Sequence, residues 1–160
     1  MRAAFYKGTR PGLQGIYSRA VRWIDRGPYS HCELVFSDGL SASASWVDGG
    51  VRFKEIDYSQ HPEHWDFVAL PDALEDYARD WFEFNMGLPY DLRGNVRFVL
   101  PWVRDSETGW FCSEAFGAAL RWREPWRYGP NGAAALVLTM YPQQPASAGR
   151  MPWGVTHATT

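Results

Sequence analysis

GPYSHCELVFSDGLSASASWVDGGVRFKEI, residues 27–56, contains the strongest structural signal in this 160-residue chain. Three runs within it alternate between side-chain types with the two-residue period of β-strands. The turn sequences SDG and VDGG separate these runs, and such turns between alternating runs are typical of antiparallel hairpins. The stretch therefore predicts three neighbouring strands in an antiparallel meander.

The first of these strands places His31 and Glu33 on one face and Cys32 and Leu34 on the other. One interpretation is that the His31 face meets water, where an imidazole and a carboxylate need no partner. The other is that Glu33 orients His31 as the base for a nucleophile elsewhere in the chain. The strand alone favours the first interpretation and leaves the second open.

Outside the meander, two more segments have strand character and four have helical spacing. The expected strands are residues 3–7 and 65–70, and the expected helices are residues 15–25, 72–86, 92–100 and 112–121. Asp72 and Glu75 lie in capping-box positions at the start of the second helix. The order of elements, a meander first and helices later, predicts an α+β domain with the sheet packed against helices.

Length and composition limit the function classes. We expect one domain over residues 1–141 and an irregular tail over 142–160, which is rich in Pro, Gly and Ser. The net charge of -2 argues against a nucleic-acid partner. Two Cys are too few for a disulfide framework or a four-thiolate zinc site.

The N-terminal sequence MRAAFYKGTRPG lacks the apolar run of a signal peptide, and no stretch reaches membrane-spanning length. We therefore expect a cytoplasmic protein with no membrane span. A substrate outside the cell would require export by another route, or release by lysis if the gene belongs to a phage.

Cys112 is the candidate nucleophile. It lies in the first turn of the helix expected in WFCSEAFGAALRW, residues 110–122, where free amides and the helix dipole favour a thiolate. Positions 112, 115, 116, 119 and 120 form one apolar stripe, so a core cysteine is the alternative. Cys32 is expected in the core. Cys112, His31 and Glu33 together offer the thiol, base and orienting group that Cys–His catalysis needs.

The order of two motifs, PYSHCEL at residues 28–34 and FCSEAF at residues 111–116, resembles the circularly permuted papain-like, NlpC-type cysteine hydrolases of the YiiX-like group. These proteins carry a Ser-His-x-Glu strand early and a Cys-Ser-Glu helix start late. The DGG turn at residues 48–50, Tyr90-Asp91 and GPNG at residues 129–132 are also similar. The resemblance spans residues 3–140.

The resemblance implies a permuted papain-like fold and a thiol hydrolase with Cys112 as nucleophile, His31 as base and Glu33 as orienting residue. Such an enzyme would cleave an amide or ester through an acyl-enzyme, on a cell-wall peptide or a lipid acyl substrate. In related acyltransferases of the lecithin–retinol type, the third residue lies on the following strand. This chain has only serines there, so Glu33 is preferred and Ser43 is second.

Two function classes stay open: this cysteine peptidase, amidase or acyl hydrolase, and a non-catalytic binding or assembly protein that retains the fold. Tyr29, Trp110 and Phe111 flank the catalytic candidates and are either core or walls of a substrate cleft. We expect no cofactor and no metal ion. His61 and His64 have a spacing found in metal sites, but Pro62 argues against a helix and favours a solvated loop.

Overall fold

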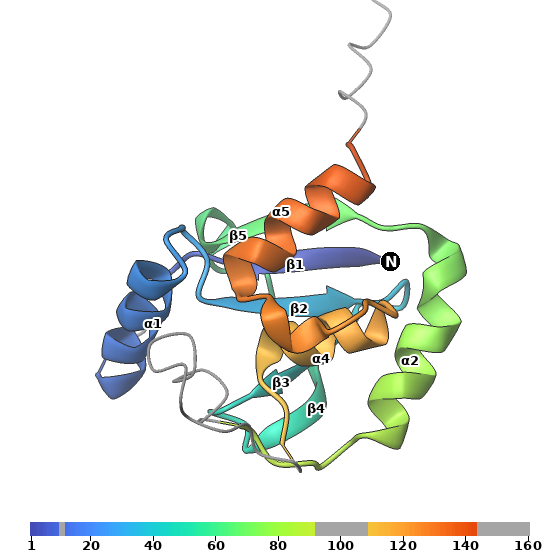
Figure 1. Ribbon diagram of the computed structural model, residues 1–160, viewed down its shortest axis with the longest axis horizontal. Coiled ribbons are helices and arrows are strands. Elements are labelled where there is room, and N and C mark those ends of the chain that lie inside the picture. Colours follow the sequence, from blue (N-terminus) through green and yellow to red (C-terminus); the bar gives the residue numbers. More distant parts are fainter. Residues whose placement is uncertain (10–11, 92–108, 144–160) are drawn as a thin grey trace, which may run out of the picture.

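The computed structural model describes residues 1–9, 12–91 and 109–143, which form an α+β domain around an antiparallel sheet (Figure 1). The five strands are β1 (Arg2–Tyr6), β2 (His31–Val35), β3 (Leu40–Ser45), β4 (Gly50–Glu55) and β5 (Trp65–Ala69). Their order across the sheet is β4-β3-β2-β1-β5. The α+β class is confirmed, and so is the antiparallel meander for β2, β3 and β4.

The meander does not extend to the last strand. β5 pairs with β1, which therefore lies between β2 and β5, one strand in from the edge of the sheet. In register, Tyr6 faces His31 on one side and Trp65 on the other. This placement was not predicted, because alternation within a strand identifies its faces and not its neighbours.

Four α-helices surround the sheet in the described residues: α1 (Leu13–Ile24), α2 (Glu75–Phe84), α4 (Cys112–Ala119) and α5 (Pro130–Met140). Short 3-10 turns cover Pro62–His64, Asp72–Leu74 and Pro125–Arg127. The sequence analysis assigned no helix to residues 130–140, and the helix it expected over residues 92–100 lies outside the described residues. The helix expected at Cys112 is confirmed and begins at that residue.

The expected capping box at the second helix is wrong. No side chain caps α2, which follows the 3-10 turn of residues 72–74. Asp72 and Glu75 instead pair with the ammonium group of Met1, at 3.0 and 3.4 Å. Glu75 also accepts hydrogen bonds from the amide and hydroxyl of Ser37, at 2.8 and 2.6 Å. The two carboxylates therefore bind the Met1 ammonium group and do not cap the start of α2.

The core lies between the sheet and α4, which packs on β2 and β3. Ala42 and Ala44 of β3 are fully buried beneath the helix, and Phe116 of α4 packs on Phe5 with ring centroids 5.7 Å apart. The small side chains of β3 allow the helix to approach closely, which sets the position of its first residue. The apolar stripe predicted for this helix is confirmed, because all five of its positions are buried.

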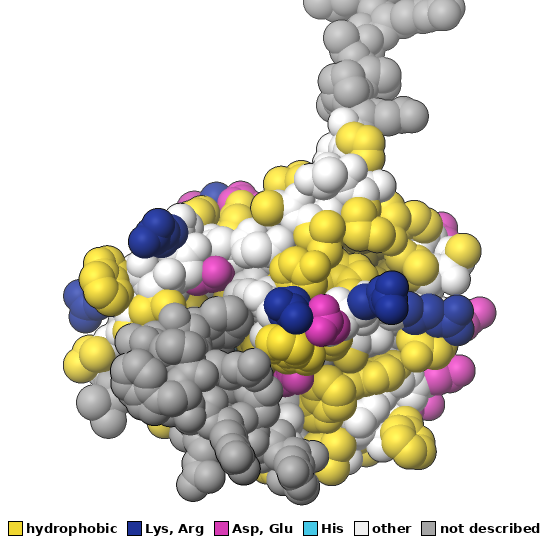
Figure 2. Space-filling model, viewed as in Figure 1, with side chains coloured by type: hydrophobic (Ala, Val, Ile, Leu, Met, Phe, Trp, Pro, Cys, Tyr) yellow, Lys and Arg dark blue, Asp and Glu magenta, His cyan; other side chains and the backbone are white. Residues whose placement is uncertain are grey.

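The apolar face expected on α1 is only partly covered. Val21 is buried, but Trp23 is 80% exposed and Ile16 is 59% exposed. α1 lies beside one end of the sheet and not across its face, so little of its stripe can reach the core (Figure 1). Apolar side chains also gather on the surface over the helices α2, α4 and α5 (Figure 2).

Candidate active site

Cys112 lies at the first position of α4, directly after Phe111, whose backbone is extended. The helix packs against β2, and the Cys112 thiol interacts electrostatically with His31 and Cys32. Cys112 is 2% exposed and Cys32 is fully buried, as expected for a core residue. Both thiols are free. Helix α4 and strand β2 therefore bring the candidate nucleophile and the candidate base together.

His31 is the first residue of β2, and its Nε2 lies 2.8 Å from Oε1 of Glu33. The side chain of His31 is 15% exposed, whereas that of Glu33 is 1% exposed. His31 and Glu33 are therefore largely buried. The interpretation that this face of the strand meets water is wrong.

Arg52 of β4 holds Glu33 in place. Its Nη1 and Nη2 each donate a hydrogen bond of 2.6 Å to one carboxylate oxygen of Glu33, a bidentate arrangement. Its Nε donates to Asp48 at 2.9 Å. Arg52 faces Ser43 in register, and this small residue on the intervening strand leaves room for the guanidinium to reach β2. The sequence analysis did not identify Arg52.

The charges of this cluster are mutually stabilised. Burial opposes ionisation of Glu33, but the hydrogen bonds and charge of Arg52, with those of His31, lower the Glu33 pKa to about 2. Burial also opposes a charged His31, but attraction to Cys112 and to Glu33 raises its pKa to about 9. At neutral pH the carboxylate is therefore ionised and the imidazole is protonated.

The Cys112 thiol is acidic. A hydrogen bond from Cys32, together with the charge of and hydrogen bond from His31, holds its pKa well below the ordinary value despite burial. The pKa of Cys32 moves in the opposite direction, since burial and the nearby Cys112 charge disfavour a second thiolate. A thiolate at residue 112 facing an imidazolium at residue 31 is a nucleophile beside its proton donor.

Ser43 does not serve as the third residue in this arrangement. Its hydroxyl donates to the carbonyl oxygen of Cys32 at 2.7 Å and is buried. It therefore supports the backbone of β2 next to His31, while Glu33 holds the imidazole.

A pocket opens beside His31, between α1 and the turn that joins β3 to β4. Its walls include the aromatic residues Tyr6, Tyr17, Trp46 and Tyr90. The hydroxyls of Tyr17 and Tyr90 lie 3.0 Å apart, and the rings of Tyr17 and Trp46 are in contact, with centroids 5.5 Å apart. His31 lines this pocket and Cys112 does not, so the pocket reaches the candidate base and not the thiol.

The three residues expected to line a cleft lie elsewhere. Phe111 is 1% exposed, and Trp110 packs edge-to-face on Trp81. Tyr29 packs on Phe5 and donates a 2.8 Å hydrogen bond to Asp66. None of the three lines the pocket beside His31, and their part in substrate binding stays a prediction.

Asn131 and Asp25 position the start of β2. The Asn131 side chain accepts from the amide of Tyr29 at 2.8 Å and donates to its carbonyl at 2.9 Å, as a neighbouring strand would. Asp25 accepts hydrogen bonds from the amide and side chain of Asn131, at 2.7 and 2.8 Å. The role of Asn131 was not predicted from the sequence, where GPNG served only as part of a resemblance. The sequence feature that could have indicated it is an Asn directly after the Pro that begins α5.

No family model matches this chain, and no solved structure matches it. A curated protein that is similar over part of its length is diaminopimelate decarboxylase of Pseudomonas aeruginosa, 32% identical over 91 residues. The match covers 54% of this chain and 21% of that enzyme, so the chain spans about a fifth of this relative's length. A match of this extent does not assign the chain to a family.

Within the described ranges, none of the helices combines the length and the apolar character that a membrane crossing requires.

Proposed function

We propose that this protein is a thiol hydrolase that cleaves an amide or ester bond through an acyl-enzyme. The observation that carries the proposal is the buried series of contacts from Cys112 to His31, Glu33 and Arg52. Each member stabilises the charge of the next, and the thiolate stands at its end. A core cysteine with no chemical role needs neither a charged imidazole nor an arginine-bound carboxylate behind it.

In the proposed reaction, the Cys112 thiolate attacks the carbonyl carbon of the substrate. The imidazolium of His31 gives its proton to the leaving amine or alcohol as that bond breaks. His31, now neutral, takes a proton from water as the water attacks the thioester, and the thiolate is released. Glu33 keeps the imidazole in its orientation and stabilises its positive charge throughout.

The start of α4 is suited to the oxyanion that forms during attack. The first amides of a helix have no partner within it, and the helix dipole favours negative charge at that end. We assign the Cys112 amide as one oxyanion donor. Donors of this kind stabilise the developing charge of the tetrahedral intermediate more than the substrate.

The permuted papain-like fold is part of the same proposal. A central antiparallel sheet, a base on an early strand and a nucleophile at the start of a later helix agree with it. The proposed substrate is a peptide amide or a lipid acyl ester, and we assign part of its binding to the aromatic pocket beside His31. The partial relative is named as a decarboxylase. Because the match covers only about a fifth of that enzyme, we do not assign decarboxylation to this chain.

The alternative is a binding or assembly protein that keeps this fold without turnover. The test is a panel of p-nitrophenyl esters, peptides and phospholipids, followed by intact mass spectrometry. We expect an acyl adduct on Cys112. Cys112→Ser and His31→Ala should each abolish turnover while the circular dichroism spectrum is unchanged, and the double variant should be hardly worse than either.

Glu83→Gln, an exposed change on α2, is the matched control and should keep full turnover. Turnover that survives Cys112→Ser would overturn the proposal. Saturable binding of a substrate to the folded wild-type chain, with neither adduct nor product, would favour the alternative.

A further inference from the structure

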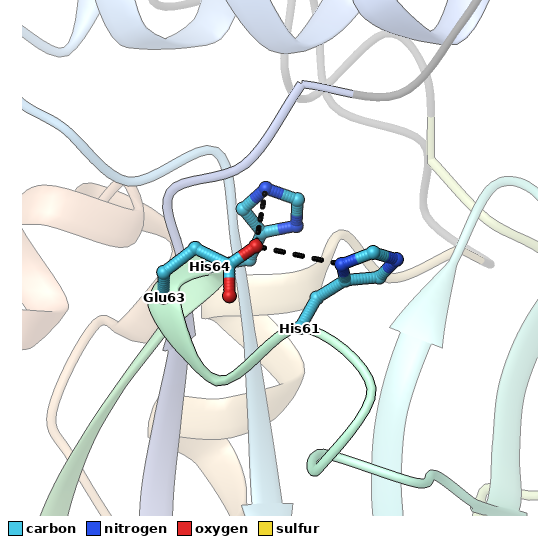
Figure 3. A group of neighbouring side chains, drawn as sticks. All are labelled: His61, Glu63 and His64. Carbon is cyan, nitrogen blue, oxygen red and sulfur yellow. Dashed lines mark ion pairs between the residues drawn. The ribbon is translucent and has the colours of Figure 1, made fainter.

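His61, Glu63 and His64 form a cluster of metal-ligand side chains outside the candidate active site (Figure 3). One nitrogen of each imidazole and one carboxylate oxygen all lie within 4.8 Å of one another. Both rings lie beside the Glu63 carboxylate, with His61 Nδ1 at 3.4 Å and His64 Nε2 at 3.5 Å from Oε1. It is the one cluster of this kind found among the residues that the structure describes.

These distances match a metal site better than a set of hydrogen bonds. Zinc binds imidazole nitrogen and carboxylate oxygen at about 2.0–2.2 Å, so two ligands of a tetrahedral ion stand about 3.4 Å apart. A hydrogen bond between the same atoms would be about 2.7–3.2 Å. The two distances from the imidazole nitrogens to the Glu63 oxygen therefore already match those between ligand atoms around a tetrahedral ion. The two imidazole rings are stacked, with centroids 5.0 Å apart and planes inclined by 27°, and the ligand nitrogens lie within 4.8 Å of one another.

The backbone under the cluster is held firmly. The sequence analysis expected Pro62 to prevent helical structure, but Pro62 begins a 3-10 turn, and its fixed φ suits that first position. The His64 amide donates to the carbonyl of His61 at 3.0 Å, and the His64 carbonyl accepts from Lys7 of the neighbouring chain segment at 2.8 Å. The turn therefore brings both imidazoles to the same side as Glu63.

The His64 ring is positioned by its neighbours. It contacts Tyr6 edge-on, with ring centroids 5.9 Å apart. A Cβ at Gly8 would come within 2.8 Å of His64 Cγ and 2.6 Å of the Tyr6 hydroxyl, so glycine is needed for this packing. His64 is 34% exposed, whereas His61 and Glu63 are 66% and 63% exposed. One ligand is thus anchored, and two can adjust around an ion.

The local charge favours a cation. The Glu63 carboxylate lies beside the two imidazoles and supplies a negative charge to the cluster. The nearby ammonium group of Lys7 is paired with Asp66 at 2.6 Å and is partly neutralised there. Two imidazoles and one carboxylate form the ligand set of open zinc sites, in which water takes the fourth position.

We propose that His61, Glu63 and His64 bind a divalent transition-metal ion of the zinc type, with the fourth position open to water. This site is independent of the proposed hydrolase activity. It lies beside the same end of the sheet as His31, because Tyr6 pairs with His31 and also contacts His64.

The test is calorimetric titration of ZnCl2 into the metal-free Cys112→Ser chain, in which the reactive thiol cannot compete for the ion. We expect one Zn²⁺ per chain. His61→Ala and His64→Ala should each weaken binding at least about tenfold, since even the loss of a group that only orients a ligand costs about 10–100-fold. Glu63→Gln should weaken it in the same direction.

His157→Ala and Glu83→Gln are matched controls, one removing a histidine and one an exposed carboxylate elsewhere in the chain. Both should bind Zn²⁺ like the parent. As a second readout, saturating Zn²⁺ should raise the melting temperature of the parent and of both controls, but not of His64→Ala. No binding below about 1 mM, which corresponds to only about 4 kcal/mol, would overturn the proposal. Equal binding by the His61 and His64 variants would also overturn it.

Discussion

Glu33 interacts with two cations at once, because it is hydrogen-bonded to His31 on one side and to Arg52 on the other. A buried carboxylate that faced His31 alone would be costly to ionise. The guanidinium offsets that cost, which leaves Glu33 free to stabilise the imidazolium. Arg52 therefore supports His31 indirectly, through the carboxylate of Glu33.

The pH dependence of activity tests this arrangement at the residue scale. The His31 pKa is raised from 6.5 to about 9, so the thiolate–imidazolium pair is complete at neutral pH and lost as the pH rises through about 9. We expect kcat/KM to fall on the alkaline side near pH 9. The stabilisation that the His31 charge gives the fold is fully present below pH 6.5 and is lost in the same alkaline window.

Glu33→Gln should move this alkaline limb to lower pH, because the Glu33 charge and hydrogen bond both raise the His31 pKa. Glu83→Gln should leave the limb where it is. An unchanged limb in Glu33→Gln, with turnover merely reduced, would mean that Glu33 supports the fold and not the charge of His31.

The two cysteines should differ in reactivity. Cys112 has a lowered pKa and lies beside His31, whereas burial and the neighbouring thiolate raise the pKa of Cys32. At pH 7, iodoacetamide should therefore label Cys112 much faster than Cys32 in the folded protein. Peptide mapping by mass spectrometry measures both rates. Equal rates, or faster labelling of Cys32, would contradict the assignment of Cys112 as the nucleophile.

At the scale of elements, the small side chains of β3 allow groups on strands β2 and β4 and on helix α4 to act together. Ala42 and Ala44 let α4 come close to the sheet, and Ser43 lets Arg52 reach across to Glu33. A large side chain at position 43 would separate Arg52 from Glu33. The small side chains of the LSASAS sequence in this strand are therefore needed for the residues of the candidate site to come together.

Arg52→Met should destabilise the protein by about 3–5 kcal/mol, because it leaves the buried Glu33 charge without its main partner. Lys54→Met is the matched control on the same strand. Its ammonium group is 48% exposed and pairs with Asp48 at the surface, so its loss should cost no more than about 1 kcal/mol. Urea denaturation at pH 7 measures both, and equal costs would contradict the role given to Arg52.

Local patterns were sufficient to predict much of the site. His31 and Glu33 are two residues apart on one strand, and Cys112 opens a helix with a clear apolar stripe, so neither needed knowledge of the fold. Arg52 could not be found in this way, because its partner is 19 residues away on a strand that is not adjacent. Asn131 and Asp25 are 106 residues apart, and only the folded chain brings them together.

The same limit applies to the sheet. The alternating pattern predicted its strands, but the place of β1 between β2 and β5 depends on contacts that no local pattern records. The capping box at Asp72 and Glu75 was mispredicted for a related reason. A distant charged group, the Met1 ammonium, competes for the carboxylates that the local motif would have used.

At the scale of the whole molecule, two segments about 100 residues apart in the sequence meet at the start of β2. The end of α1 supplies Asp25, the start of α5 supplies Asn131, and the backbone of Tyr29 lies between them. The position of His31, two residues after Tyr29, therefore depends on contacts with the start of α5. A change in α5 can alter the base without touching it.

The interior place of β1 in the sheet has a consequence for how the protein exchanges its amide protons with solvent. The first residues of a chain usually fray, so their amides exchange quickly. Here Ala3, Ala4 and Phe5 are paired with strands on both sides and are buried. Their amides should thus exchange only through global unfolding, whereas those of the edge strand β4 should also exchange through local opening. Deuterium exchange followed by mass spectrometry measures this, and equally fast exchange in β1 and β4 would contradict it.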